Sequence, residues 1–546
     1  MDAATAPRAA PRERPFPLLV LTGLCILSLL SVVAGWLADR VRGPVKTSAS
    51  CGRSVAGDEF TNAQPLKDAQ AGGCPNIEDP TTLRHVSFEL ASSISTWPSR
   101  QELVKLWWRP GQTRGHVWID KKEVKAKRHG IKQQRLSGSI GEHPEIKVGT
   151  LGSVLFELVI ILDLLGPKVS EDVSRFASFP KARAHAVRIA RVVVEAARLD
   201  LPGVRWFVMG DDDTIFCLEN VVDLLSRYDH RAQLYIGSQS ESQYANLKHG
   251  YGIAFGGGGF AVSAPLAAAL RASMDACIKR YPELETSDMW VGACAAELGV
   301  SVTSERGFHQ MDLYGVNGFL EALPTTPPLS LHHLPANPAV FPDMDQMGAI
   351  RRLVKGMAAA PALFLQQALC FDPTRNATLS VAWGYSVKVF AGIRCVRDLV
   401  RPARTFGIMA HGFGDNPANL AMDTRTPEPW ATSQCGLPFV LHVDSVSQID
   451  GQYVESTYSR HVASNQTECA AAIARLNRVR VIAEKTFRPK PGGLSRGSMT
   501  RRLCCHSMVY QEGTGEMQLE LGQCKPGQTI ATPVTDLGKL QVGPRN

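Results

Sequence analysis

A short apolar run that ends in three aspartates is the strongest pattern in the chain. Residues 206–209 show no polar alternation, a Pro-Gly pair places a turn before them, and Asp211, Asp212 and Asp213 follow. Such a run predicts a strand buried on both faces, and open α/β sheets bind ligands at the carboxyl ends of their strands. Because adjacent carboxylates repel one another, the pattern favours a divalent cation such as Mn²⁺ or Mg²⁺ that also holds a phosphate. The alternative is an acidic turn that caps the next helix.

Strands and helices alternate on both sides of this run. The apolar spacing predicts strands over residues 83–90, 115–120 and 234–237, and helices over residues 100–107, 186–197, 218–228 and 265–281. This alternation predicts an α/β fold, with a sheet that starts parallel and carries helices on both faces. We expect this domain to occupy residues 81–340.

Four consecutive glycines, at positions 256–259, interrupt the second half of this domain. We expect a short apolar strand immediately before them. Glycines let the backbone approach a ligand closely and adopt positive φ, although a flexible hairpin corner would use them as well. The tract is not a phosphate-binding P-loop, because no Gly-Lys-Ser/Thr follows it, and it does not match the dinucleotide fingerprint.

Three further polar positions could carry chemistry. Asp288 opens a predicted helix over residues 287–298. It is either a first-turn acid favoured by the helix dipole or a general base that faces the metal site. His309 and His332 are the histidine candidates, and the alternative for each is an ordinary structural histidine.

The amino terminus carries a long apolar segment. Residues 18–38 are uncharged and almost wholly apolar, which is the length needed to cross a bilayer as a helix. We predict a single-pass anchor with a cytosolic tail at residues 1–17. A cleaved signal peptide is the alternative, and either one places the rest of the chain in the secretory lumen. Residues 39–80 are polar and lack periodicity, so we expect a luminal stem.

The carboxyl-terminal part differs in composition from the rest. Seven of the thirteen cysteines lie beyond residue 341 and none forms a Cys-x-x-Cys pair, so disulfides are favoured over zinc. Asn376 and Asn465 begin glycosylation sequons. Apolar runs at residues 379–389 and 439–443 predict that residues 341–546 form a small, disulfide-linked, β-rich domain. The net charge of +8 is modest, and no basic block with aromatic residues predicts nucleic acid binding.

Taken in order, the motifs resemble those of Fringe-like glycosyltransferases, and of the plant Fringe-related group in particular. The resemblance covers residues 82–340 well and extends more loosely to about residue 510. The motifs that carry it are Trp107-Trp108-Arg109-Pro110, the element that begins Val169-Ser170-Glu171-Asp172, the run from Arg205 to Asp213, Tyr228-Asp229-His230, Gly256-Gly257-Gly258-Gly259-Phe260, Ser287-Asp288-Met289-Trp290-Val291-Gly292, Gly307-Phe308-His309-Gln310 and Ser330-Leu331-His332.

The resemblance implies a GT-A (Rossmann-like) glycosyltransferase fold in a type II Golgi membrane protein. It implies inverting transfer of a hexose or N-acetylhexosamine from a UDP-sugar to a glycan or glycoprotein, with a β-1,3 linkage. Asp213 and His332 would bind Mn²⁺ (or Mg²⁺), and Asp211 and Asp212 would contact the nucleotide or a metal-bound water.

The resemblance also implies a catalytic base. Asp288 matches the family's base, which would take the proton of the acceptor hydroxyl. The remaining candidates are Gly257, Gly258 and Gly259, which would pass close to the sugar, and, as additional positions, Trp206 and His309.

Two departures from the family pattern matter. Residues 121–167 form an insertion that related sequences lack, and we interpret it as a retained intron or gene-model error. Both neighbours of Asp288 are neutral, where the family often has an acidic residue. These departures motivate an alternative, a non-catalytic membrane-anchored protein that binds a sugar or nucleotide on the same fold. A third interpretation, a metal-dependent phosphohydrolase, lacks a second carboxylate cluster.

Overall fold

The computed structural model describes the greater part of the chain after residue 79. The described residues are 80–120, 167–314, 319–322, 326–342, 344–401, 406–408, 424, 437–461, 473–485, 503–525 and 527–531. All of them belong to one compact unit that starts at Glu78. The predicted anchor at residues 18–38, the tail and stem around it, residues 121–166 of the insertion and Asn465 lie outside the described residues. Among the described helices, none is both long and apolar enough to span a membrane.

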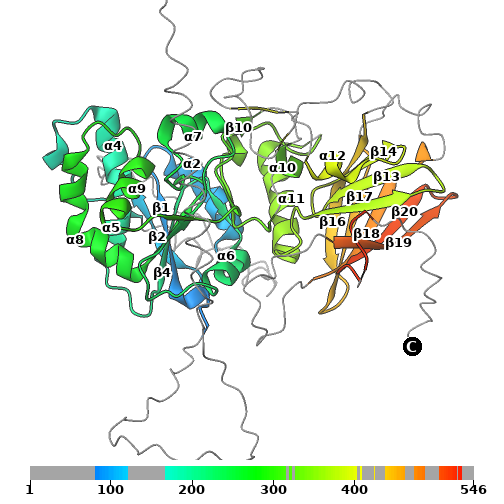
Figure 1. Ribbon diagram of the computed structural model, residues 1–546, viewed down its shortest axis with the longest axis horizontal. Coiled ribbons are helices and arrows are strands. Elements are labelled where there is room, and N and C mark those ends of the chain that lie inside the picture. Colours follow the sequence, from blue (N-terminus) through cyan, green and yellow to red (C-terminus); the bar gives the residue numbers. More distant parts are fainter. Residues whose placement is uncertain are drawn as a thin grey trace, which may run out of the picture. The chain divides into compact units, whose positions relative to one another are not determined.

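The amino-terminal half of this unit is built on a seven-stranded mixed sheet (Figure 1). In sheet order its strands are β3 (Lys168–Val169), β2 (Arg114–Ile119), β1 (Val86–Ala91), β4 (Trp206–Asp211), β7 (Phe260–Ser263), β6 (Tyr235–Gly237) and β8 (Val302–Ser304). β1 runs parallel to both β2 and β4, which confirms the predicted parallel start. β7 runs antiparallel to β4 and β6, so the sheet is mixed.

The apolar strand expected before the glycine tract is on its other side. Residues 253–255 are not in a strand, whereas β7 begins at Phe260, directly after the tract. The prediction was wrong because both flanks of the tract are apolar and short. Only the long-range pairing of β7 with β4 decides which flank joins the sheet.

Helices cover both faces of this sheet, as the alternation predicted (Figure 1). Trp206 and Val208 of β4 join one apolar cluster, and Phe207 and Met209 join the other, because successive strand side chains point to opposite faces. The first cluster includes residues of α2 (Trp97–Trp107) and α6 (Leu218–Leu225), and the second includes residues of α4 (Lys181–Ala190), α5 (Val192–Ala197), α8 (Ala264–Arg280) and α9 (Ser287–Glu297). The helix predicted over residues 186–197 is therefore two helices that meet at Arg191.

A small three-stranded sheet brings distant segments to the carboxyl edge of β4. Its strands are β5 (Ile215–Phe216), β11 (Ser330–Leu331) and β9 (Phe308–His309). Ser330 pairs with Phe216 on one side and with Phe308 on the other. This pairing places the residue after β11 next to the aspartates that precede β5. Shorter elements of this half are η1 (Leu83–His85), η2 (Ser174–Phe176), α7 (Gln243–His249), α10 (Phe319–Ala322) and η3 (Leu334–Ala336).

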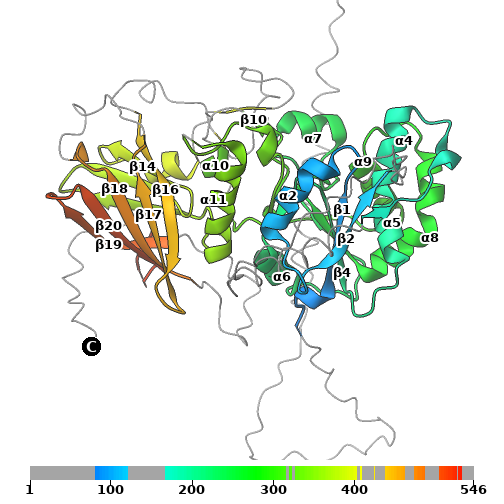
Figure 2. The same cartoon turned by 180° about the vertical axis from the view of Figure 1, so that it is seen from behind.

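The carboxyl-terminal part forms a closed eight-stranded barrel, larger than the small domain predicted (Figure 2). Around the barrel the strands are β12 (Gln367–Asp372), β13 (Ala377–Ala382), β14 (Ser386–Ala391), β16 (Phe439–Gln448), β17 (Tyr453–Ser459), β18 (Arg478–Glu484), β20 (Glu516–Gly522) and β19 (Leu503–Gln511). Parallel pairing of β12 with β19 closes the ring. Disulfides Cys370–Cys505 and Cys504–Cys524 confirm the expected cross-linking. α12 (Val396–Val400) follows β14.

The barrel shares its core with the preceding half. One cluster of buried apolar residues runs from the sheet through α11 (Gln346–Ala359) into the barrel strands. Glu321 of α10 pairs with Lys388 and accepts a hydrogen bond from Ser386, both on β14. β10 (Leu313–Tyr314) also pairs with β15 (Gly407–Ile408), which follows α12. The barrel therefore supports the segment that leads out of β9.

Removal of the disulfide between α8 and α9 should destabilise the sheet domain. Cys277 and Cys294 form this bond across a separation of 17 residues. The double replacement Cys277→Ala and Cys294→Ala should lower the free energy of unfolding by about 3 kcal/mol, because the unfolded chain gains entropy. Urea denaturation would measure the loss. Cys395→Ser is the control, since Cys395 is exposed and not in a disulfide; an equal loss in both variants would contradict the prediction.

Candidate active site

The three aspartates at the end of β4 each have a different environment. Asp211 is the last residue of the strand, and its main-chain N–H donates to Thr214 Oγ1 at 2.9 Å. Thr214 in turn donates to the carbonyl of Gly257 at 2.7 Å. The turn after β4 is therefore tied to the glycine tract.

Asp212 contacts the segment between β1 and α2, and Asp213 contacts α2 itself. Asp212 Oδ2 accepts hydrogen bonds from Ser92 Oγ and Thr96 Oγ1, each at 2.7 Å. Asp213 Oδ2 lies 3.0 Å from Arg100 Nη1. The expected role of Asp212 in nucleotide contact stays a prediction, and in this structure two hydroxyl groups hold its carboxylate.

His332 faces the other two aspartates. It follows β11, and its Nε2 lies 3.0 Å from Asp213 Oδ1 and 3.7 Å from Asp211 Oδ2. Its Nδ1 lies 3.2 Å from the carbonyl oxygen of Gln310, which can only accept a hydrogen bond. The proton therefore belongs on Nδ1, and Nε2 is left as a ligand atom, as is usual for metal-binding histidines.

Asp211, Asp213 and His332 could together hold a divalent cation. One ligand atom from each residue lies within 4.8 Å of the other two. Two carboxylates and an imidazole oriented through its other nitrogen form a donor set suited to Mn²⁺ or Mg²⁺. The family resemblance implied that Asp211 contacts the nucleotide or a metal-bound water, and the structure adds it to the potential metal ligands.

The electrostatics of these three residues reflect their crowding. Burial raises the pKa of Asp213, but the hydrogen bond and charge of His332 and the charge of Arg100 outweigh it and lower the pKa to about 2. Burial and the charges of Asp213 and Asp288 raise the pKa of Asp211 to about 7. Because 37% of the Asp211 side chain stays exposed, solvent moderates this shift. Burial lowers the pKa of His332, and the contacts with Asp213 more than reverse this.

The glycine tract fits against both the metal ligands and Asp288. A Cβ atom added at Gly256 would lie 2.6 Å from Asp288 Oδ1, and one added at Gly257 would lie 2.1 Å from His332 Cε1. Gly259 has a φ of +86°, and a Cβ there would meet Phe216 at 2.9 Å. The tract therefore passes so close to these residues that a side chain at Gly256, Gly257 or Gly259 would not fit. Glycine permits this close approach of the backbone.

Asp288 lies in the first turn of α9, where Thr286 is the N-cap. Its Oδ1 accepts a hydrogen bond from Ser287 Oγ at 2.9 Å, and the main chain of Gly256 also hydrogen-bonds its carboxylate. Burial raises the pKa of Asp288 despite these bonds. The neutral neighbour noted in the sequence thus contacts the carboxylate directly.

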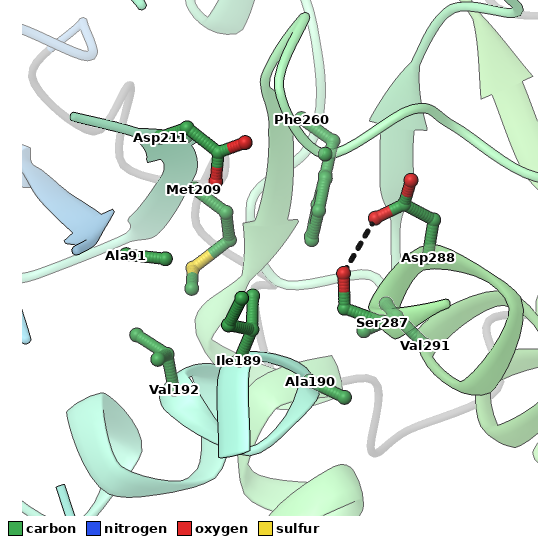
Figure 3. Close-up of a pocket in the computed structure, with 12 residues that line it drawn as sticks. Ala91, Ile189, Ala190, Val192, Met209, Asp211, Phe260, Ser287, Asp288 and Val291 are labelled. Carbon is green, nitrogen blue, oxygen red and sulfur yellow. Dashed lines mark hydrogen bonds between the residues drawn. The ribbon is translucent and has the colours of Figure 1, made fainter. Parts of the chain in front are cut away.

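Asp288 and Asp211 line the same pocket. The two carboxylates reach it from different elements, α9 and β4 (Figure 3). Apolar side chains complete much of its wall, among them Ile189, Met209 and Phe260. The pocket therefore combines two carboxylates with an apolar lining, as ligand sites commonly do.

Trp206 and His309 belong neither to the pocket lining nor to the group that could hold a cation. Trp206 is fully buried in the core under the sheet. His309 is buried on β9, and its Nδ1 lies 2.9 Å from Glu241 Oε1. Arg100 and Gln310 contact the site and were not singled out from the sequence. Gln310 was within a quoted motif, but only its histidine neighbour had an obvious chemical role.

Comparisons with known proteins give partial matches. A family model described as "Protein of unknown function, DUF604" matches residues 245–505, from the sheet domain into the barrel. The chain is 34% identical to the beta-1,3-glucosyltransferase of Homo sapiens over 105 residues, which is 19% of this chain and 20% of that protein. It is 34% identical to the beta-1,3-glucosyltransferase of Mus musculus over 107 residues, 20% of this chain and 21% of that protein. The chain thus matches about a fifth of the length of these curated relatives.

Among solved structures, the apo form of mouse xyloside xylosyltransferase 1 matches 42% of this chain and 86% of its own. The sequence identity is 8% and the TM-score is 0.23. This likeness is too weak to carry an argument about fold or activity.

Gly257→Ala should disrupt cation binding at this site. The new Cβ would overlap the His332 ring, so His332 must move away from Asp213. We expect Mn²⁺ affinity to fall about tenfold or more, as measured by isothermal titration calorimetry. Gly252→Ala is the matched control, because a Cβ there meets nothing within 4 Å. Unchanged Mn²⁺ affinity in Gly257→Ala would show that His332 is not a ligand.

Cation binding should strengthen as the pH rises through about 7. In the metal-free protein the pKa of Asp211 is raised to about 7 and that of His332 is also raised, so both bind protons that a cation must displace. The protonated fraction falls as pH rises, and below pH 7 the affinity should drop by about tenfold per pH unit for each proton displaced. Mn²⁺ titrations between pH 5.5 and 8.5 would measure this. A flat profile would exclude Asp211 and His332 from the ligand set.

Proposed function

We propose that this chain is a metal-dependent glycosyltransferase of the GT-A type. It transfers a hexose or N-acetylhexosamine from a UDP-sugar to a hydroxyl group of a glycan or glycoprotein, with inversion and a β-1,3 linkage. One observation carries the proposal: Asp211 of the potential cation site and a separate carboxylate, Asp288, line one pocket, and the glycine tract lies against both Asp288 and His332. The order of the sequence motifs and the local similarity to two beta-1,3-glucosyltransferases support it.

The proposed reaction is a single in-line displacement. The acceptor oxygen forms a bond to the anomeric carbon while the bond from that carbon to the β-phosphate oxygen breaks, and UDP leaves with the bonding electrons. Asp288 takes the proton of the acceptor hydroxyl and later releases it to solvent. A cation held by Asp211, Asp213 and His332 would stabilise the negative charge on the diphosphate.

The environment of Asp288 suits a general base. Its pKa is raised by burial, and a carboxylate with a raised pKa accepts a proton more readily than an ordinary one. The hydrogen bonds from Ser287 and Gly256 fix the direction of its carboxylate. No covalent nucleophile is needed, so one base and one cation site meet the requirements of an inverting transfer.

The two other functions considered from the sequence find less support. A phosphohydrolase with two metal ions needs a second ligand cluster. Within the described ranges one group of three residues could hold a cation. A protein that binds sugar nucleotides without transferring the sugar would use the same site, and the measurement of transfer itself distinguishes it from the enzyme.

We further propose that the chain is a type II Golgi membrane protein anchored by residues 18–38, with the described unit in the lumen. Three disulfides among the described residues support an oxidising compartment. Asn376 of the first sequon is exposed in the turn between β12 and β13, so it is accessible for glycosylation.

Asp288→Asn and Asp213→Asn should both abolish transfer, for different reasons. Asp288→Asn keeps the shape but removes the base, so kcat should fall about 10²- to 10⁴-fold while Mn²⁺-dependent UDP binding is kept. Asp213→Asn should weaken UDP binding itself, because a cation ligand is lost. Mn²⁺-dependent UDP release from a panel of UDP-sugars, with calorimetry for binding, would test both variants. Full activity in both would refute the proposal, and UDP binding without turnover in the wild type would favour the non-catalytic alternative.

A further inference from the structure

Gln310 contacts the two halves of the site through different parts of the same residue. Its main-chain carbonyl accepts the hydrogen bond from His332 Nδ1 at 3.2 Å. Its side-chain Oε1 accepts a hydrogen bond from the main-chain N–H of Gly258 at 2.5 Å, and its Nε2 lies 3.2 Å from Asp312 Oδ1. Gln310 is buried, with 8% of its surface exposed, so these contacts are shielded from water.

The main chain around Gln310 is held firmly in place. Met311 has a φ of 54°, a left-handed conformation that a side chain of this size rarely adopts. Glu241 accepts a hydrogen bond from the Met311 N–H at 2.7 Å, and its other oxygen lies 2.9 Å from His309 Nδ1. Surrounding contacts of this kind are what maintain an unfavourable backbone conformation. The buried His309–Glu241 pair, which has no part in the proposed reaction, thus serves to hold this backbone in place.

The glycine tract is fixed by side chains at three points. Thr214 donates to the carbonyl of Gly257, and Ser330 donates to the carbonyl of Gly258. Gln310 accepts the N–H of Gly258. An added Cβ at Gly258 would lie 2.9 Å from the main-chain nitrogen of Gln310, so the tract is already in close contact with this residue.

The location of the tract gives these contacts a function. Gly256 lies against Asp288 and Gly257 lies against His332. In the proposed reaction, the sugar must lie between the base and the cation-bound diphosphate, which is the space that the tract borders. We infer that Gln310 is a positioning residue whose side chain sets the glycine tract against the donor sugar, while its main chain orients the metal ligand His332. The inference rests on the proposed function.

Gln310→Met tests this division of roles. Methionine has a similar size and leaves the main-chain carbonyl in place, so His332 should keep its orientation, whereas the hydrogen bond to Gly258 is lost. In the full-length protein with Mn²⁺, we expect UDP affinity to stay within about threefold of wild type. We expect UDP-sugar affinity to fall at least about tenfold, together with kcat, because a buried N–H loses its partner.

Two further variants sharpen the comparison. Gln310→Glu keeps an oxygen for the Gly258 N–H but loses the donor to Asp312 Oδ1, as Gln310→Met does too. If the Gly258 contact positions the tract, Gln310→Glu should therefore lose less UDP-sugar affinity than Gln310→Met. Gln367→Met is the matched control, since Gln367 on β12 donates to Ser380 Oγ at 3.0 Å and to the carbonyl of Leu399 at 2.9 Å, within the barrel. It should leave the affinities for UDP and UDP-sugar unchanged.

The outcomes separate this inference from the proposed function. If the affinities of Gln310→Met for UDP and for UDP-sugar fall in parallel and its melting temperature is lower, Gln310 is only a structural support and the inference is overturned. Wild-type behaviour of Gln310→Met would overturn it as well. If the wild type transfers no sugar, the proposed function fails. Calorimetry with UDP and UDP-sugars would still measure whether Gln310→Met loses affinity for the UDP-sugar selectively. If the wild type binds neither ligand, both fail.

Discussion

The repulsion between carboxylates at the end of β4 is the constraint on which the site depends. Each aspartate of the triplet is compensated differently: Asp212 by hydroxyls next to α2, Asp213 by Arg100 and His332, and Asp211 by His332 at the longer distance of 3.7 Å. Burial, together with the charges of the neighbouring aspartates, raises the pKa of Asp211 to about 7. A divalent ion bound there would offset this repulsion, so the charges that destabilise the metal-free site would favour a cation.

Long-range pairing puts the compensating groups in place. His332 reaches the aspartates because β11 inserts between β5 and β9, which are more than 90 residues apart in sequence (Ile215–Phe216 and Phe308–His309). The glycine tract then has to pass between His332 and Asp288, and side chains at Gly256 and Gly257 would overlap these residues. The glycines are therefore a steric consequence of the way the small sheet closes over the end of β4.

The parts of the fold that depend on local pattern could be predicted from the sequence. The β4 strand and α9 follow from uninterrupted apolar runs and capping residues, and Asp211, Asp213, His332 and Asp288 were all named. The parts that depend on pairing between distant segments could not. The direction of β7, its place after the glycines and the closure of the barrel by β12 and β19 leave no local signal. The contacts of Gln310 could not be predicted for the same reason, because its partners, Gly258 and His332, come from other segments.

Closure of the barrel has a consequence for how the protein is made. β12 pairs with β19, and β20 fills the gap between β19 and β18, so no complete ring exists until the ribosome has released residues up to Gly522. The sheet domain is synthesised before the barrel and can begin to fold first. However, α11 and Glu321 make their contacts with β16 and β14 only after those strands have been synthesised. During that interval the nascent chain exposes apolar surface and unpaired strand edges. Completion of the sheet domain's core therefore depends on barrel strands that are synthesised after it, and a chain that stops before β14 and β16 would leave part of this shared core uncovered.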